Sequence, residues 1–190
     1  MSVLKNKQSF QIFDVGASSI NNSRYKIHNE DIINIKNFKC SKNKSIDCTV
    51  LYICDGHHNI DTLFDKNNNN KPINTHNLCQ KFIEKSIPIL INNLNIEKLN
   101  ENKIKELITK WCISVDNEIK TRNIMGGSTL SIALLYPNYN KLIQVIVGDS
   151  KSIFISFNKQ YIDISPVHRM NNINERIKLL DNGEKLEELL

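Results

Sequence analysis

Several features are missing from the sequence, and each absence excludes a class of protein. No apolar run approaches the roughly 20 residues that a membrane-spanning helix needs. The N-terminal residues MSVLKNKQSF lack the apolar core of a secretory signal. The five cysteines are odd in number and form no C-x-x-C pair, which favours reduced thiols over a disulfide framework. We therefore expect a protein of the cytoplasm or the nucleus, with no membrane partner.

Basic residues are in excess, but they are not concentrated in one place. The formal net charge is +5, and the densest basic segment, residues 36–45, is predicted to be a solvated loop. A phosphate-rich partner at that segment is the less favoured alternative, and no nucleic acid is expected. Apolar residues make up 40% and charged residues 24%, which is typical of a globular domain. We expect one domain over residues 1–190, with a disordered Asn-rich loop at 65–76.

The spacing of apolar residues predicts strands, then helices, then strands. Residues 48–54 are nearly all apolar, which suits a strand buried on both faces. Helical spacing covers 78–94, where Pro88 should kink or divide the helix, and 104–119. Further strands are expected at 11–15, 31–38, 130–136, 142–147, 153–157 and 161–164, with a helix from Ile173 onward. This order predicts an α+β domain in which helices cover antiparallel sheets.

Acidic residues recur where the predicted strands end. Glu30 and Asp31 precede one strand, Asp55 follows another, and Asp149 lies between two more. Hard cations such as Mg²⁺ and Mn²⁺ prefer oxygen ligands and keep several waters. A carboxylate at a strand end is rigidly held and open to solvent, so these positions are candidates for a metal site. Taken singly, each one is more simply a turn or a surface residue.

Beside these carboxylates stand a glycine, a histidine and two basic residues. Gly56 has no side chain to obstruct a metal, so its carbonyl could approach one. His57 is placed to donate a proton to a leaving oxygen. Arg24 or Lys26 could neutralise a bound phosphate.

Five segments in a fixed order resemble the motifs of one family, the metal-dependent protein serine/threonine phosphatases of type 2C. The segments are SRYKIHNED, LYICDGHHN, GGSTLSIALL, VIVGDSKSIF and SPVHRMNNINERIKLLDNG. The resemblance runs from about residue 10 to residue 182. It implies an antiparallel β-sandwich flanked by helices, and hydrolysis of phosphoserine and phosphothreonine by a water that bridges two Mg²⁺ or Mn²⁺ ions.

The resemblance also implies roles for single residues. Asp55 would bridge the two ions, and the Gly56 carbonyl would bind one of them. Glu30 and Asp31 would hold metal-bound waters. His57 would protonate the departing serine or threonine oxygen. Asp149 would either hold a third metal or cap its hairpin, and these two roles stay open.

The sequence departs from the family pattern at four places. Lys26 stands where the family has its phosphate-binding arginine, and Arg24 lies two residues earlier. His58 and Asn59 replace two glycines after His57, and Val167 replaces an acid before His168. The family's later metal-binding aspartates lie beyond the strands found here, so we expect the sandwich to be incomplete at its C-terminal side. We therefore expect either an active phosphatase that acts on a phosphoprotein, or an inactive pseudophosphatase or truncated domain that acts as a binding or regulatory module for a protein partner.

Overall fold

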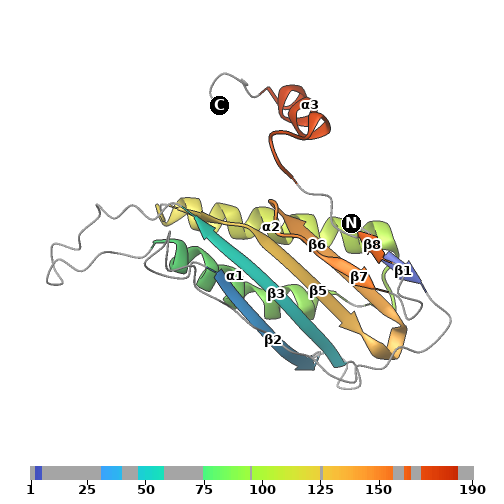
Figure 1. The fold of residues 1–190 in the computed structure, drawn as a ribbon. Helices are drawn as coiled ribbons and strands as arrows, with labels where there is room; N and C mark the ends of the chain where they lie inside the picture. Colours follow the sequence, from blue (N-terminus) through green and yellow to red (C-terminus); the bar gives the residue numbers. More distant parts are fainter. Residues whose placement is uncertain are drawn as a thin grey trace, which may run out of the picture.

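The computed structural model describes residues 3–5, 31–39, 47–57, 75–94, 96–124, 126–155, 161–163 and 168–183. Their elements follow the order β1 (Val3–Lys5), β2 (Asp31–Lys39), β3 (Asp47–His57), α1 (Thr75–Asn93), α2 (Glu101–Thr121), β4 (Gly127–Ser128), β5 (Leu130–Tyr136), a 3₁₀ turn (Pro137–Tyr139), β6 (Lys141–Val147), β7 (Ile153–Ile155), β8 (Tyr161–Asp163) and α3 (Ile173–Asp181) (Figure 1). Strands, helices and strands thus follow one another in the predicted order, and the predicted α+β class is confirmed.

The main sheet is antiparallel and places the long strand β3 near its middle. The strand order is β1-β6-β5-β3-β2, with β4 paired to the end of β3. Along β3, Cys48, Val50, Tyr52 and Cys54 are buried, and the residues between them are more exposed. This period of two is that of a strand with one covered face. The prediction that β3 is buried on both faces is therefore wrong, although Leu51 and Ile53 on its other face are apolar.

Two helices cover one face of the sheet and close the core (Figure 1). α2 begins after Asn100, whose side chain accepts a hydrogen bond from the Lys103 amide at 2.9 Å, which is a regular N-cap. Trp111 on α2 donates from its indole nitrogen to the Ser86 carbonyl of α1 at 3.2 Å, so its polar atom is paired inside an apolar contact. Ile87, Leu90, Ile104, Ile132, Leu134 and Ile143 are among the fully buried side chains between the layers.

The remaining elements lie outside this two-layer unit. β7 and β8 form a two-stranded antiparallel sheet of their own. α3 begins after the N-cap residue Asn172 and lies apart from the main sheet in Figure 1. Three apolar side chains on α3 remain exposed, those of Ile173, Ile177 and Leu180. No helix within the described residues has the length and apolar character that a bilayer span requires.

Two local predictions differ from the structure in part. α1 runs as one helix from Thr75 to Asn93 with Pro88 inside it, so Pro88 does not divide it, and the kink stays a prediction. Ile87 and Leu90 on either side of Pro88 are buried, and core packing outweighs the local cost of the proline. Thr75 and His76 belong to α1, so the Asn-rich loop ends earlier than predicted. The rest of that loop and the strand predicted at 11–15 lie outside the described residues.

Candidate functional site

Two carboxylates face each other at one end of the sheet. Asp31, the first residue of β2, is the register partner of Asp55 near the end of β3. Asp55 lies on the sheet face opposite the helices, because it alternates with the buried residues Cys54 and Gly56, and its register partner Asp31 lies on the same face. Directly paired residues of antiparallel strands have Cα atoms about 4.5–5.5 Å apart. Like charges in such a pair repel each other, and a cation between them would remove that repulsion.

The backbone of Asp55 is fixed on both sides by Thr129. The Thr129 amide donates to the Asp55 carbonyl at 2.8 Å, and the Asp55 amide donates to the Thr129 hydroxyl at 3.1 Å. The Ser128 hydroxyl also donates to the Asp55 carbonyl at 3.2 Å. One residue earlier, the carbonyl of Cys54 accepts a hydrogen bond from the Gln80 side chain of α1 at 3.1 Å. Gln80 is only 2% exposed, so this bond is shielded from water and holds the end of β3 against the helix layer.

The next two residues of β3 pair with β4. Gly56 lies opposite Ser128, and His57 lies opposite Gly127. A Cβ atom at Gly127 would lie 2.5 Å from His57 Nε2, closer than real contacts allow. Glycine at position 127 therefore leaves room for the imidazole, which is itself exposed to solvent. Gly56 is buried.

The loop after β6 continues the same row across the sheet. Leu130 pairs with Val147, so Thr129 and Gly148 are the next residues of the two strands. Gly148 has a φ of +89°, and a Cβ there would lie 2.9 Å from the Thr129 methyl. The hydroxyls of Thr129 and Ser150 are 2.5 Å apart. Thr129 thus joins the end of β3 to the loop that carries Asp149.

Asp149 is engaged by a residue that the motif analysis passed over. Its Oδ2 accepts a hydrogen bond from Arg169 Nε at 2.9 Å, in a partly exposed ion pair. The His168 amide donates to the Gly148 carbonyl at 3.2 Å, which ties the same loop to the segment before α3. These contacts give Asp149 a structural partner. The two roles predicted for it, binding a third metal and capping its hairpin, stay predictions.

The described residues contain two candidate metal ligands and no group of three. Among them, no set of three or more His, Cys, Asp or Glu side chains is arranged to hold a metal. Mg²⁺ keeps several waters and needs only one or two protein carboxylates, so Asp31 and Asp55 are the candidates. A second ion would need further oxygen ligands. Glu30, Arg24 and Lys26 lie outside the described residues.

A thiol lies next to Asp55 in the sequence but on the other face of the strand. Cys54 is fully buried, and burial raises the pKa of its thiol to about 12. Because side chains alternate along a strand, Cys54 faces the helix layer whereas Asp55 faces away from it. The candidate ligands beside Asp55 are therefore oxygen atoms.

Sequence reasoning missed Gln80 and Arg169. Gln80 is a polar residue on the buried side of an otherwise apolar helix stripe, and this signal was available. Arg169 meets Asp149 only through the fold, because 20 residues separate them.

Comparisons with known proteins point to one fold. No family model and no curated protein matches the sequence. Among solved structures, one titled as a bacterial serine phosphatase is similar with a TM-score of 0.52 and 19% identity, over 87% of this chain and 57% of that one. The serine/threonine phosphatase PstP/Ppp of Mycobacterium tuberculosis is similar with a TM-score of 0.47 and 14% identity, over 84% of this chain and 55% of that one. The chain thus spans little more than half the length of either structure. Its fold is that of the type 2C protein serine/threonine phosphatases.

Proposed function

We propose that the protein is a metal-dependent phosphatase that hydrolyses phosphoserine and phosphothreonine in a phosphoprotein. The observation that carries the proposal is the pairing of Asp31 with Asp55 at the open end of the sheet. Two carboxylates held this close are stable when a cation lies between them. The phosphatase fold supports the reaction class. We also propose a cytoplasmic or nuclear location, because the N-terminal residues lack the apolar core of a secretory signal and the cysteine pattern favours reduced thiols.

Asp55 and Asp31 would hold the cation, Mg²⁺ or Mn²⁺, with Glu30 and the Gly56 carbonyl as further oxygen donors. When bound, such an ion supplies a Lewis acid and lowers the pKa of water. Asp149 would join it only by releasing Arg169. Gln80 and Thr129 act through the backbone, because their hydrogen bonds keep the Asp55 carboxylate at one position.

His57 would donate the proton that the departing serine or threonine oxygen needs. Its exposed ring lies over Gly127, two residues along β3 from Asp55. Lys26 and Arg24 would hold the phosphate, with lysine giving charge but no bidentate contact.

The test is a phosphopeptide assay with Mn²⁺, together with calorimetric titration of Mn²⁺. Asp55→Asn should abolish both phosphate release and the heat of Mn²⁺ binding. Asp31→Asn should lower the affinity for Mn²⁺ at least tenfold. Asp116→Asn is the matched control, because Asp116 is an exposed aspartate on α2 whose ion pair with Lys120 lies outside the site. Equal rates and equal heats for wild type and Asp55→Asn would refute the proposal.

A binding module that has lost catalysis is the second candidate. One observation favours it, namely that no third His, Cys, Asp or Glu side chain joins Asp31 and Asp55 within the described residues. The titration separates the two candidates. Mn²⁺ heat with phosphate release supports the enzyme, whereas no heat and no release support the binding module.

A further inference from the structure

One edge of the main sheet is only partly covered. β5 pairs with β6 from Lys141 to Val147, whereas on the other side of β6 the strand β1 pairs only with Lys141, Leu142 and Ile143. No strand among the described residues pairs with this outer edge at residues 144–147. Unpaired backbone N–H and C=O groups at a sheet edge are a template for another strand. The sequence Gln-Val-Ile-Val here contains no lysine, proline or glycine that would block such pairing.

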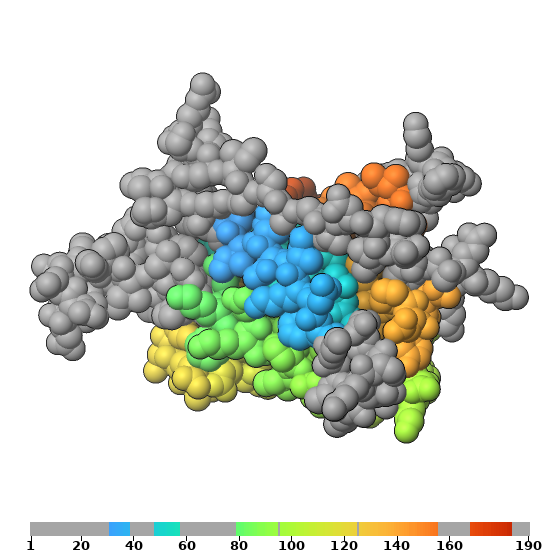
Figure 2. Space-filling view, turned by 90° about the horizontal axis from the view of Figure 1, so that it is seen from below, coloured from blue at the N-terminus to red at the C-terminus, as the bar shows by residue number. Residues whose placement is uncertain are grey.

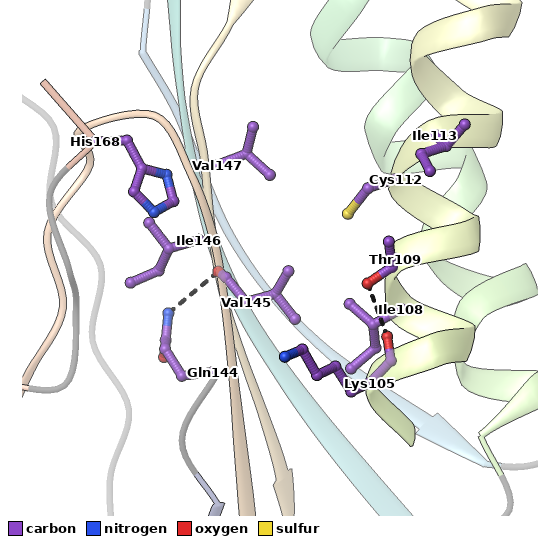
Figure 3. Close-up of a pocket in the computed structure, with 10 residues that line it drawn as sticks. All are labelled: Lys105, Ile108, Thr109, Cys112, Ile113, Gln144, Val145, Ile146, Val147 and His168. Atoms are coloured by element: carbon purple, nitrogen blue, oxygen red, sulfur yellow. Dashed lines mark hydrogen bonds between the residues drawn. The ribbon is translucent and has the colours of Figure 1, made fainter. Parts of the chain in front are cut away.

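A groove of about 260 Å³ lies between this edge and α2. Figure 3 shows that Val145 and Val147 point from β6 toward the helix, where Ile108 and Cys112 lie across from them. Val147 is 42% exposed and Ile113 on α2 is 56% exposed, so the wall of the groove is apolar yet open to solvent. Side chains at alternate positions of an added strand would enter this groove.

The other side of the edge carries a polar group whose hydrogen bonding is incomplete. Gln144 is 3% exposed, and its Oε1 has no partner among the described residues. Its Nε2 donates to the Ser131 hydroxyl at 3.1 Å and to the carbonyl of Val145 at 3.4 Å (Figure 3). The second bond is longer than an ordinary N–H···O bond. A backbone N–H of an added strand would supply the Val145 carbonyl with a better donor and could also reach the amide oxygen.

One end of the groove carries a positive charge. Lys105 lies at the Gln144–Val145 end, and His168 lies beside Ile146 (Figure 3). Lys103 and Lys110 both form ion pairs with Glu106, whereas Lys105 has no ion pair within the described residues. An acidic residue near this end of a bound segment would complement Lys105.

We propose that the outer edge of β6 at residues 144–147 binds an extended peptide segment of a partner protein as an added antiparallel strand. The antiparallel direction continues the pairing of β1 on the same edge. Such a segment begins opposite Val147 and ends opposite Val145, because β1 already begins opposite Ile143 on the same edge. It places alternate apolar side chains against α2 and an acidic residue near Lys105 at its C-terminal end. The proposal is independent of the phosphatase function, because it uses neither Asp31 nor Asp55.

The probe is a fluorescent six-residue peptide in which valine and threonine alternate and the last residue is glutamate. Binding is measured by anisotropy, and amide hydrogen exchange of the full chain is followed with and without peptide. We expect saturable binding that slows exchange of the amides in residues 144–147 by about tenfold or more. The control peptide has the same side chains but N-methylated valines, which cannot pair with a strand, and it should not bind.

Two surface variants, Ile113→Glu and Lys105→Glu, locate the site, and Ile89→Glu is their control. Ile113→Glu places a charge at the groove and should weaken binding at least tenfold. Ile89→Glu changes an equally exposed isoleucine, 60% exposed on α1, and should leave binding unchanged. Lys105→Glu should weaken binding of the peptide that ends in glutamate. The same variant should bind a peptide that ends in lysine more tightly than it binds the glutamate peptide. Three results would each overturn the proposal. The first is that the N-methylated peptide binds as well as the unmodified one, and the second is that Ile113→Glu and Ile89→Glu weaken binding equally. The third is that the edge amides are already protected from exchange before peptide is added, whether by this chain or by a second copy.

Discussion

The two edges of the main sheet are built differently. At one edge β2 pairs with β3 over nine residues, and its side chains are largely polar or charged. Lys36 of β2 turns toward α1 and forms an ion pair with Glu84, with Asn34 also donating to Glu84 at 3.4 Å. Figure 2 shows β2 at the surface beside α1. At the other edge, β6 offers a short apolar stretch beside a groove.

Charge on an edge strand discourages pairing with other chains, and its absence permits it. The β2 edge therefore suits a site for small ligands, with Asp31 at its first residue. The β6 edge suits a protein contact. The predictions that follow test this difference, beginning with the centre of the sheet that both edges share.

The largest effect is expected from Ile132→Ala in β5. Ile132 is fully buried between the helices and the sheet, and loss of its side chain leaves a cavity. The free energy of unfolding should fall by about 2–5 kcal/mol, as measured by urea denaturation. Ile89→Ala on the exposed side of α1 should change it by less than about 0.5 kcal/mol. A loss at Ile132 no larger than at Ile89 would show that the central strand does not support the core.

Thr129 joins the two halves of the sheet, and Thr129→Val should have the next largest effect. The variant keeps the shape but leaves the Asp55 amide without its acceptor and removes the contact with Ser150. We expect a loss of about 1–2 kcal/mol in urea denaturation. Thr129→Ser keeps the hydroxyl and should lose less. If the two variants were equally destabilised, the methyl group rather than the hydroxyl would be the connecting element.

At the β6 edge, Gln144→Met should raise stability slightly. Methionine fills a similar volume, and it removes an amide oxygen that has no partner among the described residues. Ser131 keeps its hydrogen bond to Ser152 at 2.6 Å. Replacing an incompletely bonded buried amide by an apolar group is expected to add about 0.5–1 kcal/mol to the free energy of unfolding. A loss of similar size in thermal denaturation would mean that the bonds of Gln144 outweigh its burial cost.

The smallest effect is expected from the ion pair between Lys36 of β2 and Glu84 of α1. The hydrogen bond from Lys36 lowers the pKa of Glu84 below its ordinary value. A lowered carboxyl pKa stabilises the fold at pH values above the ordinary pKa, near 4.3, and this stabilisation is lost as the pH falls through the lowered folded-state value. Because both side chains are partly exposed, Glu84→Gln should cost only about 0.5 kcal/mol at pH 7.

The measurement for Glu84 is urea denaturation of both proteins between pH 7 and pH 2.5. The difference between wild type and Glu84→Gln should disappear at the acid end. Glu118→Gln, in a single exposed pair with Arg122 on α2, is the matched control and should give a smaller difference at pH 7. A difference for Glu84 that grew on acidification would contradict the sign of the pKa shift.

Much of the central fold was predictable, because local patterns and tertiary packing agree there. The alternation of Leu130, Ile132, Leu134 and Tyr136 corresponds to the buried side of β5. The stripe of Ile104, Ile108 and Trp111 corresponds to the buried side of α2. β3 was misjudged because apolar residues on both faces cannot reveal which face another layer covers. Pro88 does not divide α1 as local propensity alone would allow, because that propensity ignores the packing around it.

The candidate site was predictable in composition but not in arrangement. Carboxylates at strand ends indicated Asp31 and Asp55, and only the strand register shows that they face each other. The ion pair of Asp149 with Arg169 depends on where a distant segment returns, which no short-range pattern contains. The roles of Lys26, Arg24, Glu30 and His57 remain predictions.

The hydroxyl pairs on the open face of the sheet have a mechanical consequence. Thr129 contacts Ser150 and Ser131 contacts Ser152, so the segment after β6 is fastened to β5 at two successive points. A pull applied at the C-terminal side would therefore act on β5 through these two hydroxyl contacts as well as through the strand ladder of β5 and β6. Because the Thr129 hydroxyl also accepts a hydrogen bond from the Asp55 amide, Thr129 would pass such tension to the Asp55 end of the sheet.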